Sequence, residues 1–429
     1  MEPITLLRDK RILLGVTGGI AAYKVCSLAS RLTQAGAQVD VVLTEAATRF
    51  MAPLTFQALT GRPVYADLWD TPGEGLSTHI AHVGLAHDAD LFVVAPATAN
   101  TLSKLAQGLA DNMLSTLALA ARCPTLAAPA MDIGMWAHPA TQANAATLRA
   151  RGVHFAGPAW GRMASGLEGE GRMVEPDELL GHVRRVLGLA GDLAGRRAVV
   201  TAGPTREAVD PVRFLSNPSS GRQGFALAQA ALDRGASVTL VSGPTSLPTP
   251  VGAERVKVTS AQEMRDATLA ACAEADVLLM AAAVADYGPA AVAPQKIKKG
   301  ATDLSLRLAR TPDILAAVAA QRAESGFPRA MVGFAAETQN LVENARAKLA
   351  AKGLDLIVAN DVTAQDAGFG AETNRVSLIS REGEVETLPL LSKRVVAEAV
   401  LGHVARRLEG MKDEGQRTKD EGRSGNERA

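Results

Sequence analysis

The chain has 429 residues, with 45 Lys and Arg against 45 Asp and Glu, and three cysteines: Cys26, Cys123 and Cys272. A formal net charge of zero argues against a dedicated nucleic-acid-binding protein, which normally carries a basic excess. Three widely spaced cysteines exclude a disulfide framework or a CxxC zinc site. Hydrophobic residues make up 47% of the chain but aromatic residues only 3%, which is typical of an α/β enzyme whose strands are buried on both faces.

The hydropathy pattern predicts neither a secretory signal nor a membrane span. The N-terminal sequence MEPITLLRDKR has no long apolar run after a basic start. Uninterrupted apolar stretches of about 18 residues, which a membrane-spanning helix needs, do not occur in the chain. Unpaired cysteines fit a reducing compartment. We therefore expect a cytoplasmic protein without a membrane or nucleic-acid partner.

The first half of the chain predicts strands that alternate with helices. An apolar run enters a Thr-Gly-Gly loop, a helix follows, and a second apolar run follows the helix. The expected strands lie at 11–16, 39–43, 91–95 and 124–128, and the expected helices at 21–34, 100–108, 112–121 and 139–151. This alternation predicts a parallel sheet with helices on both faces.

A second unit begins near the small-residue stretch GLAGDLAG at 188–195. At one constant spacing, Leu28, Ala29, Gly36, Ala37, Val39 and Val42 recur as Leu227, Ala228, Gly235, Ala236, Val238 and Val241. General likeness between any two βαβ units accounts for most of this match. We interpret the chain as two doubly wound, Rossmann-like or flavodoxin-like α/β units with mainly parallel sheets.

The expected elements of the second unit lead to a charged C-terminal tail. Strands are predicted at 197–201, 277–283, 331–335 and 356–359, helices at 312–322, 341–351 and 392–408, and an antiparallel hairpin at 376–379 and 385–388. After residue 408 the chain is charged, contains glycine and has no apolar face. We therefore predict domains at 1–190 and 191–408, followed by a disordered tail at 409–429.

The strand ends of the first unit carry residues that suit a phosphate-bearing cofactor. A lone Thr-Gly-Gly loop is also compatible with a simple tight turn, but here it opens a helix, where backbone N–H groups bind phosphate. Small hydroxyl and amide residues follow the later strands as well. Because these strand ends meet at one edge of a parallel sheet, we expect one site there. Its candidate residues are Thr17, Gly18, Gly19, Ile20, Thr44, Pro96, Thr98, Asn100 and Thr101.

Three histidines, His79, His82 and His87, lie close together in the sequence. Their spacing suits zinc, but no Asp, Glu or Cys completes an obvious ligand set, so we assign no metal ligands. A single histidine acting as a base beside a cofactor fits better. The remaining histidines then lie on the surface or cap helices.

The motifs of the first unit resemble the flavin-dependent cysteine decarboxylases. They are GVTGGIAAYK at 15–24, HVGLA at 82–86, DLFVVAPATAN at 90–100, ADN at 110–112 and PAMDIGMW at 129–136. The resemblance implies that FMN binds at the candidate residues given above. It also implies that FMN oxidises the substrate's thiol towards a thioaldehyde, CO2 leaves, and reduced flavin returns the electrons. His82 then serves as the catalytic base, and Asn112, Met131 and Asp132 contact the substrate.

Two residues of the first unit depart from the family pattern. Asp132 stands where the family has an asparagine that holds the substrate carboxylate, and an aspartate there repels that carboxylate unless it is protonated or paired. Ser165 stands nearest to the position of a cysteine that donates a proton from a mobile flap, here 161–173. We therefore regard Ser165 as a candidate catalytic residue and Arg162, Glu168 and Glu170 as further candidates in the flap, the alternative being that this segment is a solvated loop.

The motifs of the second unit resemble phosphopantothenate–cysteine ligase. They are TAGPTREAVDPVR at 201–213, SNPSSG at 216–221, AVADY at 283–287, KIKK at 296–299, GFAAE at 333–337 and NDV at 360–362. Together the two halves are similar to the fused bacterial enzymes of coenzyme A synthesis over roughly residues 10–408. The implied substrates are 4'-phosphopantothenate, cysteine and CTP.

Ligation of a carboxylate requires its activation, which the family achieves through an acyl-cytidylate. Such a site needs positive charge and positioning, for which Arg206, Arg222 and the lysines of KIKK are candidates. The resemblance implies that Asn217 holds the acyl-cytidylate, that Lys296 stabilises the triphosphate, and that Mg²⁺ binds through triphosphate oxygens. The implied CTP contacts are Asp286, Lys296, Thr311, Pro312, Asp313, Ile314, Phe334, Lys348 and Lys352.

Four functional interpretations follow, of which a bifunctional enzyme that makes 4'-phosphopantetheine is the leading one. Asp132 and Ser165 motivate a second, an active ligase fused to a flavoprotein with impaired decarboxylation. A third is a non-catalytic nucleotide-binding regulatory protein, against which the ligase motifs speak. A dehydrogenase is the fourth, but the strand at 39–43 does not end in the acidic residue that would bind ribose.

The resemblance also implies a homo-oligomer. Decarboxylase units of this kind assemble as trimers, with FMN between subunits, and the ligase units pair as dimers. Some residues of the first site are therefore expected to act across an interface.

Overall fold

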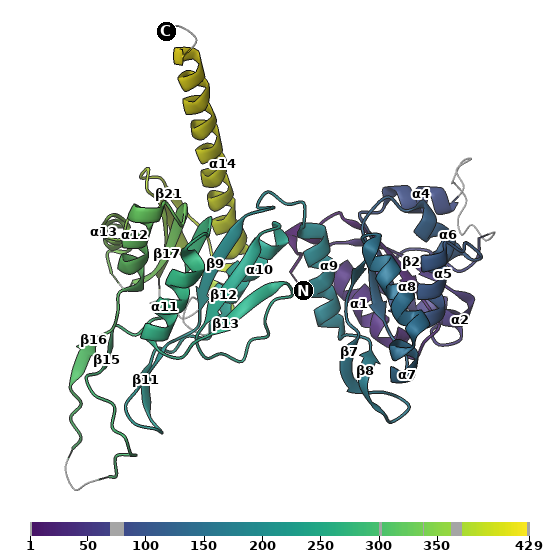
Figure 1. The fold of residues 1–429 in the computed structure, drawn as a ribbon, viewed down its shortest axis with the longest axis horizontal. Coiled ribbons are helices and arrows are strands. Elements are labelled where there is room, and N and C mark those ends of the chain that lie inside the picture. The colour runs from purple at the N-terminus through teal and green to yellow at the C-terminus, as the bar shows by residue number, and fades with distance from the viewer. Residues whose placement is uncertain (1, 69–80, 300–302, 338, 362–370, 427–429) are drawn as a thin grey trace. The chain divides into compact units, whose positions relative to one another are not determined.

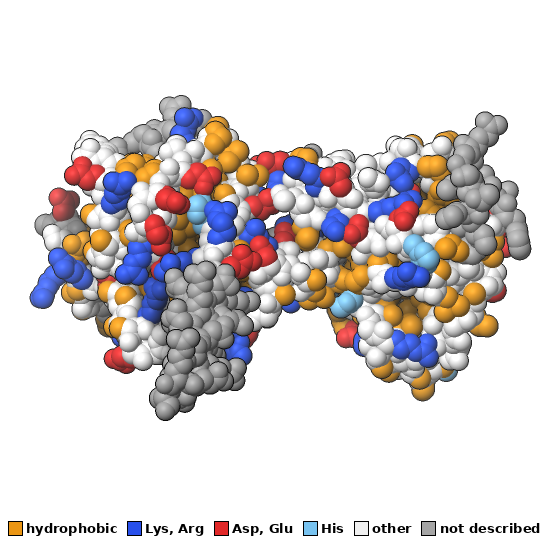
Figure 2. Space-filling model, turned by 90° about the horizontal axis from the view of Figure 1, so that it is seen from above, with side chains coloured by type: hydrophobic (Ala, Val, Ile, Leu, Met, Phe, Trp, Pro, Cys, Tyr) orange, Lys and Arg blue, Asp and Glu red, His pale blue; other side chains and the backbone are white. Residues whose placement is uncertain are grey.

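In a computed structural model, the chain forms two compact units, residues 1–188 and 189–429 (Figure 1). The structure describes residues 2–68, 81–299, 303–337, 339–361 and 371–426. On the face that Figure 2 shows, basic and acidic side chains are interspersed over both units, as the balanced composition leads one to expect.

A six-stranded parallel sheet forms the centre of the first unit, in the order β3-β2-β1-β4-β5-β6. Its central strands are short apolar runs that are buried on both faces, as strands in a doubly wound sheet must be. The strands are β1 Arg11–Val16, β2 Gln38–Leu43, β3 Val64–Tyr65, β4 Leu91–Ala97, β5 Thr125–Pro129 and β6 His154–Phe155.

Helices cover both faces of this sheet. One apolar cluster packs α1, α3 and α9 against the sheet, and a second packs α4, α5, α6 and α8 against the other face. The helices are η1 Thr5–Leu7, α1 Ala22–Gln34, α2 Glu45–Thr48, α3 Pro53–Thr60, α4 Ala81–Asp88, α5 Ala99–Gln107, α6 Met113–Ala120, α7 Ile133–Ala137, α8 Pro139–Ala150 and α9 Pro176–Gly188. A separate antiparallel hairpin consists of β7 Ala159–Arg162 and β8 Glu168–Arg172.

The second unit repeats this plan and extends it. Its eight-stranded sheet has the order β13-β12-β9-β14-β17-β18-β20-β21, in which β20 pairs antiparallel with β18 and β21 pairs antiparallel with β20. The strands are β9 Arg197–Ala202, β12 Ser237–Ser242, β13 Ala253–Lys257, β14 Val277–Met280, β17 Ala330–Glu337, β18 Leu356–Asp361, β20 Val376–Ser380 and β21 Val385–Thr387.

Helices cover both faces of the second sheet. One apolar cluster includes α10 and α14, and the other includes α11, α12 and α13. The helices are α10 Arg222–Asp233, α11 Ala261–Cys272, α12 Ile314–Ser325, α13 Leu341–Ala351 and α14 Lys393–Asn426. Three small antiparallel pairs complete the unit: β10 Arg206–Ala208 with β11 Phe214–Ser216, β15 Tyr287–Pro289 with β16 Leu308–Arg310, and β19 Thr373–Asn374 with β22 Leu391–Ser392.

The predicted fold class is confirmed, because both units contain a parallel sheet that begins with the doubly wound order 3-2-1-4-5-6. The repeat in the sequence also has a structural basis. Gly36 and Gly235 have φ values of 101° and 91° and link α1 to β2 and α10 to β12. Glycine adopts this left-handed conformation without strain from a Cβ. Equivalent carboxylates, Asp90 and Asp276, accept hydrogen bonds from the first residue of β1 and β9.

The segment predicted as a tail, 409–429, overlaps the last helix, α14. In the structure α14 continues through this segment to Asn426. The tail is rich in Lys, Glu and Arg, which have high helix propensity, and a helix that has begun on the core propagates more easily than one that must nucleate. Among the described residues, no helix is both long and apolar enough to span a membrane.

Two helical glycines provide a test of how closely the helices of the second unit approach their neighbours. A Cβ at Gly224 in α10 would lie 2.5 Å from the Cβ of Ala202 in β9, whereas a Cβ at Gly402 in α14 would have its nearest neighbour 3.9 Å away. We predict that Gly224→Ala lowers the free energy of unfolding by about 1–3 kcal/mol through overpacking. Gly402→Ala should raise it by up to about 1 kcal/mol because alanine favours helix. Urea unfolding midpoints of the full chain should shift in opposite directions, and a common direction would contradict this packing.

Candidate functional site

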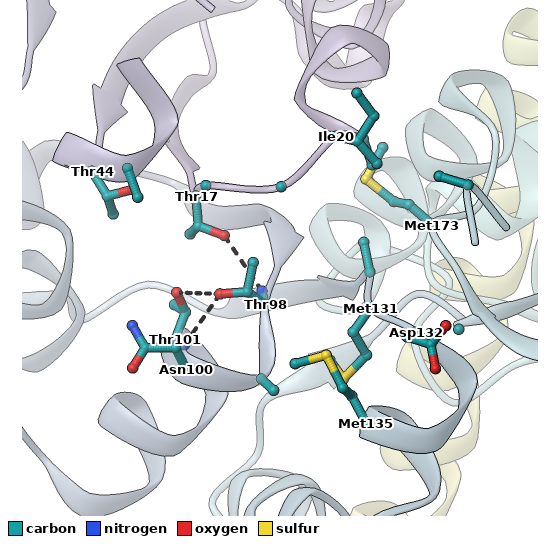
Figure 3. Close-up of a pocket in the computed structure, with 18 of the residues that line it drawn as sticks. Thr17, Ile20, Thr44, Thr98, Asn100, Thr101, Met131, Asp132, Met135 and Met173 are labelled. Atoms are coloured by element: carbon teal, nitrogen blue, oxygen red, sulfur yellow. Dashed lines mark hydrogen bonds between the residues drawn. The ribbon is translucent and has the colours of Figure 1, made fainter. Parts of the chain in front are cut away.

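A cavity of about 1060 Å³ lies at the carboxyl edge of the first sheet (Figure 3). The loops after β1, β2, β4 and β5 form its walls, together with the start of α6 and the β7–β8 hairpin. Parallel pairing brings these loops together because the carboxyl ends of all the strands lie at the same edge. The volume lies just above the usual range for sites that take cofactors or drug-sized ligands, about 300–1,000 Å³.

Hydroxyl groups line one side of this cavity and form a connected network. Thr17 Oγ1 donates to the carbonyl of Pro96 at 2.5 Å and accepts from the N–H of Thr98 at 3.4 Å. The hydroxyls of Thr98 and Thr101 lie 3.1 Å apart, and Thr98 caps the N-terminus of α5. Figure 3 shows these threonines facing Met131, Met135 and Met173 across the cavity, with Asp132 beside Met131.

Gly18 allows the glycine loop to lie directly against the loop after β2. A Cβ at Gly18 would lie 2.4 Å from the Cβ of Ala46 and 2.9 Å from its carbonyl carbon, which is too close for any side chain. At Gly19 the nearest atom would be 3.6 Å away, an ordinary contact. The first glycine therefore has a packing role, and the tight approach brings Thr17 and Thr44 to the same cavity.

Asp132 and Ser165, the two departures from the family pattern, are in direct contact. Ser165 Oγ donates a hydrogen bond of 2.9 Å to Asp132 Oδ2, while Asp132 Oδ1 accepts the N–H of Gly134 at 3.0 Å and so caps α7. Both residues line the cavity. The bond joins the loop of the β7–β8 hairpin to the wall formed by α7.

Glycines in β8 bring the hairpin close to the same wall. A Cβ at Gly169 would lie 2.0 Å from Ile133 Cδ1, and one at Gly171 would lie 2.4 Å from the carbonyl oxygen of Met131. Met131 donates its N–H to Gly171 O at 2.9 Å. The hairpin is therefore packed against the residues that precede and begin α7, and it closes one side of the cavity.

Paired charges surround the cavity. Lys24, which is almost fully buried, donates to the carbonyl of Met173 at 3.1 Å and to Glu175 at 2.9 Å. The hydrogen bond from Lys24 lowers the pKa of Glu175. Lys104 donates to Asp111 at 2.6 Å, and this bond lowers the pKa of Asp111. Both lysines line the cavity, and sequence reasoning assigned a role to neither.

Most of the predicted residues of the first site line this one cavity. The wall includes Asn112, Met131, Asp132, Ser165 and all predicted FMN contacts except Pro96. Pro96 lies within β4 and takes part through its carbonyl, which accepts the Thr17 hydroxyl. His82 belongs to the first turn of α4, but its side chain lies outside the described residues, as does all of His79. No group of His, Cys, Asp and Glu that could hold a metal ion occurs among the residues that the structure describes.

The predicted nucleotide residues of the second unit come from the segments after β14 and before α12, from β17 and from the helices α12 and α13 with their ends. Thr311 donates its N–H to the carbonyl of Asp286 at 3.0 Å and its hydroxyl to that of Ala285 at 2.5 Å. Lys348 Nζ donates to the carbonyl of Phe334 at 3.1 Å. These bonds join the segment after β14 to the start of α12, and α13 to β17.

Asp313 and Lys352 form an ion pair next to these residues. Asp313 also caps α12 through the N–H of Ala316. Burial raises the pKa of Asp313, but the hydrogen bonds from Lys352 and the N–H of Ala316, together with the charges of Lys352 and Lys348, outweigh that effect, so the pKa is lowered overall. Pro312 directly precedes the capping residue Asp313. The side chain of Ile314, which follows it, is buried and packs in the core.

Asn217 and Lys296 lie on two different extensions of the second unit, which we call arms: the β10–β11 hairpin with the residues that follow it, and the β15–β16 pair with its loop. Asn217 follows β11, and its Nδ2 donates to the carbonyls of Ala283 and Val284 at 3.3 and 3.0 Å. Lys296 is exposed on the loop between β15 and β16. The neighbouring Ile297 donates its N–H to Asp210 at 3.0 Å. Asp210 belongs to the motif TAGPTREAVDPVR, but nothing in the sequence indicated its contact with Ile297.

Comparisons with known proteins match both units. The Flavoprotein family model matches residues 2–188, and the DNA/pantothenate metabolism flavoprotein C-terminal domain model matches residues 193–408. The coenzyme A biosynthesis bifunctional protein CoaBC of Bacillus subtilis (strain 168) is 46% identical over 403 residues, which cover 93% of this chain and 98% of that protein.

Two solved structures each resemble one unit. The crystal structure of the C-terminal domain of CoaBC has 41% identity and a TM-score of 0.44, and the match covers 51% of this chain and 99% of that chain. A cysteine-to-serine mutant of PPC decarboxylase, complexed with pantothenoylaminoethenethiol, has 34% identity and a TM-score of 0.38, covering 41% of this chain and 97% of that one.

The match to the Bacillus protein extends through both units at nearly full length, so it concerns the whole arrangement and not one shared fold. The two family models divide the chain at the same place as the structure does. The chain therefore belongs to the CoaBC family of bifunctional enzymes of coenzyme A biosynthesis, in which a flavoprotein decarboxylase (a lyase) is joined to a ligase.

Proposed function

We propose that the second unit ligates 4'-phosphopantothenate to cysteine with CTP and that the first unit decarboxylates the product to 4'-phosphopantetheine with FMN. The observation that carries the proposal is the cavity of the first unit, where residues from four strand ends and the β7–β8 hairpin converge. Membership of the CoaBC family supplies the reaction class. We also propose that the enzyme acts in the cytoplasm.

The cavity fits a flavin mononucleotide in its chemistry. Threonine hydroxyls and the N-termini of α1 and α5 suit the phosphate and polyol parts of such a group, because helix N-termini and backbone N–H groups bind anions. The methionine side of the cavity suits an apolar ring. FMN, when bound, supplies two-electron oxidation and reduction. The chain's own residues hold and orient the reactants.

We assign the substrate end of the cavity to Asn112, Met131, Asp132 and the hairpin, with His82 as the base. Asp132 is held by Ser165 and by the N–H of Gly134. Both donors are neutral, so they supply no positive charge against the repulsion that a substrate carboxylate meets at this position. Arg162 also lines the cavity and supplies positive charge there.

The same contact favours a second candidate function, an active ligase joined to a flavoprotein with slow decarboxylation. In the structure the Ser165 hydroxyl donates to Asp132, and so its proton points to a carboxylate and not into the cavity. A serine hydroxyl is also a much weaker acid than the thiol of cysteine, whose pKa is about 8.5. Proton donation by Ser165 is therefore the step most open to impairment.

For the ligase we propose that Asn217 holds the acyl-cytidylate and that Lys296 stabilises the triphosphate. Asp286, Thr311, Pro312, Asp313, Ile314, Phe334, Lys348 and Lys352 form the CTP site, in which Ile314 contributes through its backbone. The hydrogen bonds between these segments support a common site. We propose that Mg²⁺ enters with the triphosphate, because it needs few protein carboxylates when phosphates bind it.

We further propose that the protein is a homo-oligomer, with trimers of the first unit and dimers of the second. Ile20, Tyr23 and Met135 line the cavity yet are more than half exposed in one chain, at 64%, 59% and 51%. Large apolar side chains at the mouth of a site are typical of a surface that another subunit covers. Val292 and Leu304 are similarly exposed on an arm of the second unit.

We predict that His82→Asn separates the two activities. The variant should release pyrophosphate from CTP, phosphopantothenate and cysteine at the wild-type rate, because the ligase is untouched. Its release of CO2 should fall by at least about 10²-fold if the imidazole acts as base. His87→Asn, on the exposed side of the same helix, is the control. Undiminished CO2 release from His82→Asn would disprove the assignment.

We predict that Ser165 limits the reductive half of the decarboxylation. Mass analysis of the full reaction should show an oxidised enethiol beside phosphopantetheine in the wild type. Ser165→Cys should shift the ratio towards phosphopantetheine, because a thiol is the stronger acid, and Ser165→Ala should shift it the other way. If all three proteins yield the same ratio, the proton comes from another group.

We predict that Asn217→Asp uncouples the two steps of ligation. The substitution removes the amide N–H that donates to the carbonyls of Ala283 and Val284. The new carboxylate also repels an anionic intermediate. Quenched single-turnover reactions should show acyl-cytidylate accumulating, with amide formation slowed by about 10²-fold or more. The flavin spectrum of the variant should match the wild type and so report an intact first unit. Loss of pyrophosphate release would place Asn217 in the first step instead.

A further inference from the structure

The loop that carries Lys296 depends on a neighbouring hairpin for its position. It extends from β15 to β16, and its base is held where Ala290 donates its N–H to the carbonyl of Arg307 at 2.9 Å. Farther along, Ala293 donates to the carbonyl of Val209 at 3.0 Å. Val209 begins the turn that joins β10 to β11. The residues that bear the lysine cluster Lys296, Lys298 and Lys299 belong to no helix or strand.

A buried carboxylate lies in that turn. The side chain of Asp210 has no exposed surface, and its Oδ1 accepts the N–H groups of Val212 and Arg213, both at 2.9 Å. Its Oδ2 accepts Arg213 Nε at 2.9 Å and Nη2 at 2.5 Å. The same oxygen accepts the N–H of Ile297 at 3.0 Å. One carboxylate therefore closes the turn and also binds the lysine loop.

Arg213 binds the same residue of the loop from its other side. Besides its two bonds to Asp210, its Nη2 donates to the carbonyl of Ile297 at 2.6 Å. The N–H and the C=O of Ile297 are thus both held by one ion pair. Ile297 lies between Lys296 and Lys298, so fixing its peptide groups fixes the starting point of both lysine side chains.

We propose that Asp210 and Arg213 are positioning residues for the ligase, which clamp Ile297 and thereby place Lys296 for the triphosphate of CTP. This rests on the proposed function of Lys296. An exposed lysine on an irregular loop would otherwise spread its charge over many positions, whereas catalysis by charge requires a donor fixed before the reaction. Because the clamp acts on the backbone, it leaves the Lys296 ammonium group available to a ligand.

The clamp stays charged over the working pH range of an enzyme. The hydrogen bond from Arg213 holds the pKa of Asp210 well below its usual range, with smaller contributions from the N–H groups of Val212, Ile297 and Arg213, although burial acts in the opposite direction. A depressed carboxyl pKa means that the stabilisation is present at neutral pH and is lost only in strong acid. The placement of Lys296 should therefore not vary with pH between about 6 and 9.

Trypsin provides a readout of the clamp that does not involve activity. We expect Asp210→Asn to speed cleavage of the full chain after Lys296 and Lys298 by about tenfold, because loss of the charged bonds lets the loop open. Asp276→Asn is the matched control. Asp276 is likewise buried and bound to an arginine and a backbone N–H, but it lies at the start of β14, at the opposite edge of the sheet. It should leave cleavage at the two lysines unchanged.

A double-mutant cycle tests whether the clamp acts through Lys296. Asp210→Asn should lower kcat/KM for CTP, measured by pyrophosphate release, by about tenfold, and Lys296→Gln by at least as much. In the double variant the Asp210 change should have little further effect, because the side chain that it positions is gone. Arg213→Lys keeps the charge but cannot hold both Asp210 and Ile297, and it repeats the test if Asp210→Asn folds poorly. If the two substitutions lower kcat/KM independently, so that their factors multiply in the double variant, the proposal is wrong.

The outcomes separate this inference from the proposed function. If Lys296→Gln releases pyrophosphate normally while Asp210→Asn still opens the loop to trypsin, the clamp exists but the role of Lys296 in ligation is wrong. If Lys296→Gln is impaired while Asp210→Asn changes neither cleavage nor kcat/KM, the ligase assignment holds and the clamp is refuted.

Discussion

Parallel pairing of strands is the constraint on which both functional units depend. Pairing of β1 with β2 and β4 sets the ends of these strands side by side, so that the loops after residues 16, 43 and 97 share one edge. No loop on its own forms the cavity, because the hydroxyls that line it come from separate parts of the sequence. The close contact of Gly18 with Ala46 shows how little space separates two of these loops.

The same strand order serves two different kinds of site. In the first unit, the sheet edge and a short hairpin enclose a single cavity. In the second unit the equivalent edge carries Asp286, Thr311 and Phe334, but Asn217 and Lys296 come from arms that extend beyond the sheet. Arms of this kind gain little support from the sheet's apolar core and are held largely by hydrogen bonds and ion pairs. The buried carboxylate of Asp210 provides one such support.

Features that depend on neighbouring residues, such as strands and helix ends, could be predicted from the sequence. Apolar runs predicted the central strands, and glycine at 36 and 235 marked equivalent helix ends, because burial and backbone freedom act on consecutive residues. The residues of the first cavity were found for the same reason, since strand ends in a parallel sheet must converge. Contacts between distant side chains left no such pattern. Nothing in the sequence paired Lys24 with Glu175, Asp132 with Ser165, or Asp210 with Ile297.

The contact between Asp132 and Ser165 changes the meaning of two substitutions that look independent in the sequence. Considered singly, an aspartate adds a repulsive charge near a carboxylate and a serine removes an acidic proton. Considered together, they form a hydrogen bond that joins the β7–β8 hairpin to the start of α7. The amide of an asparagine at position 132 would also accept a hydrogen bond from the Ser165 hydroxyl, but the amide is neutral and so the bond would be weaker. The hydrogen bond to a carboxylate therefore holds the hairpin more firmly against the cavity wall than a bond to an amide would.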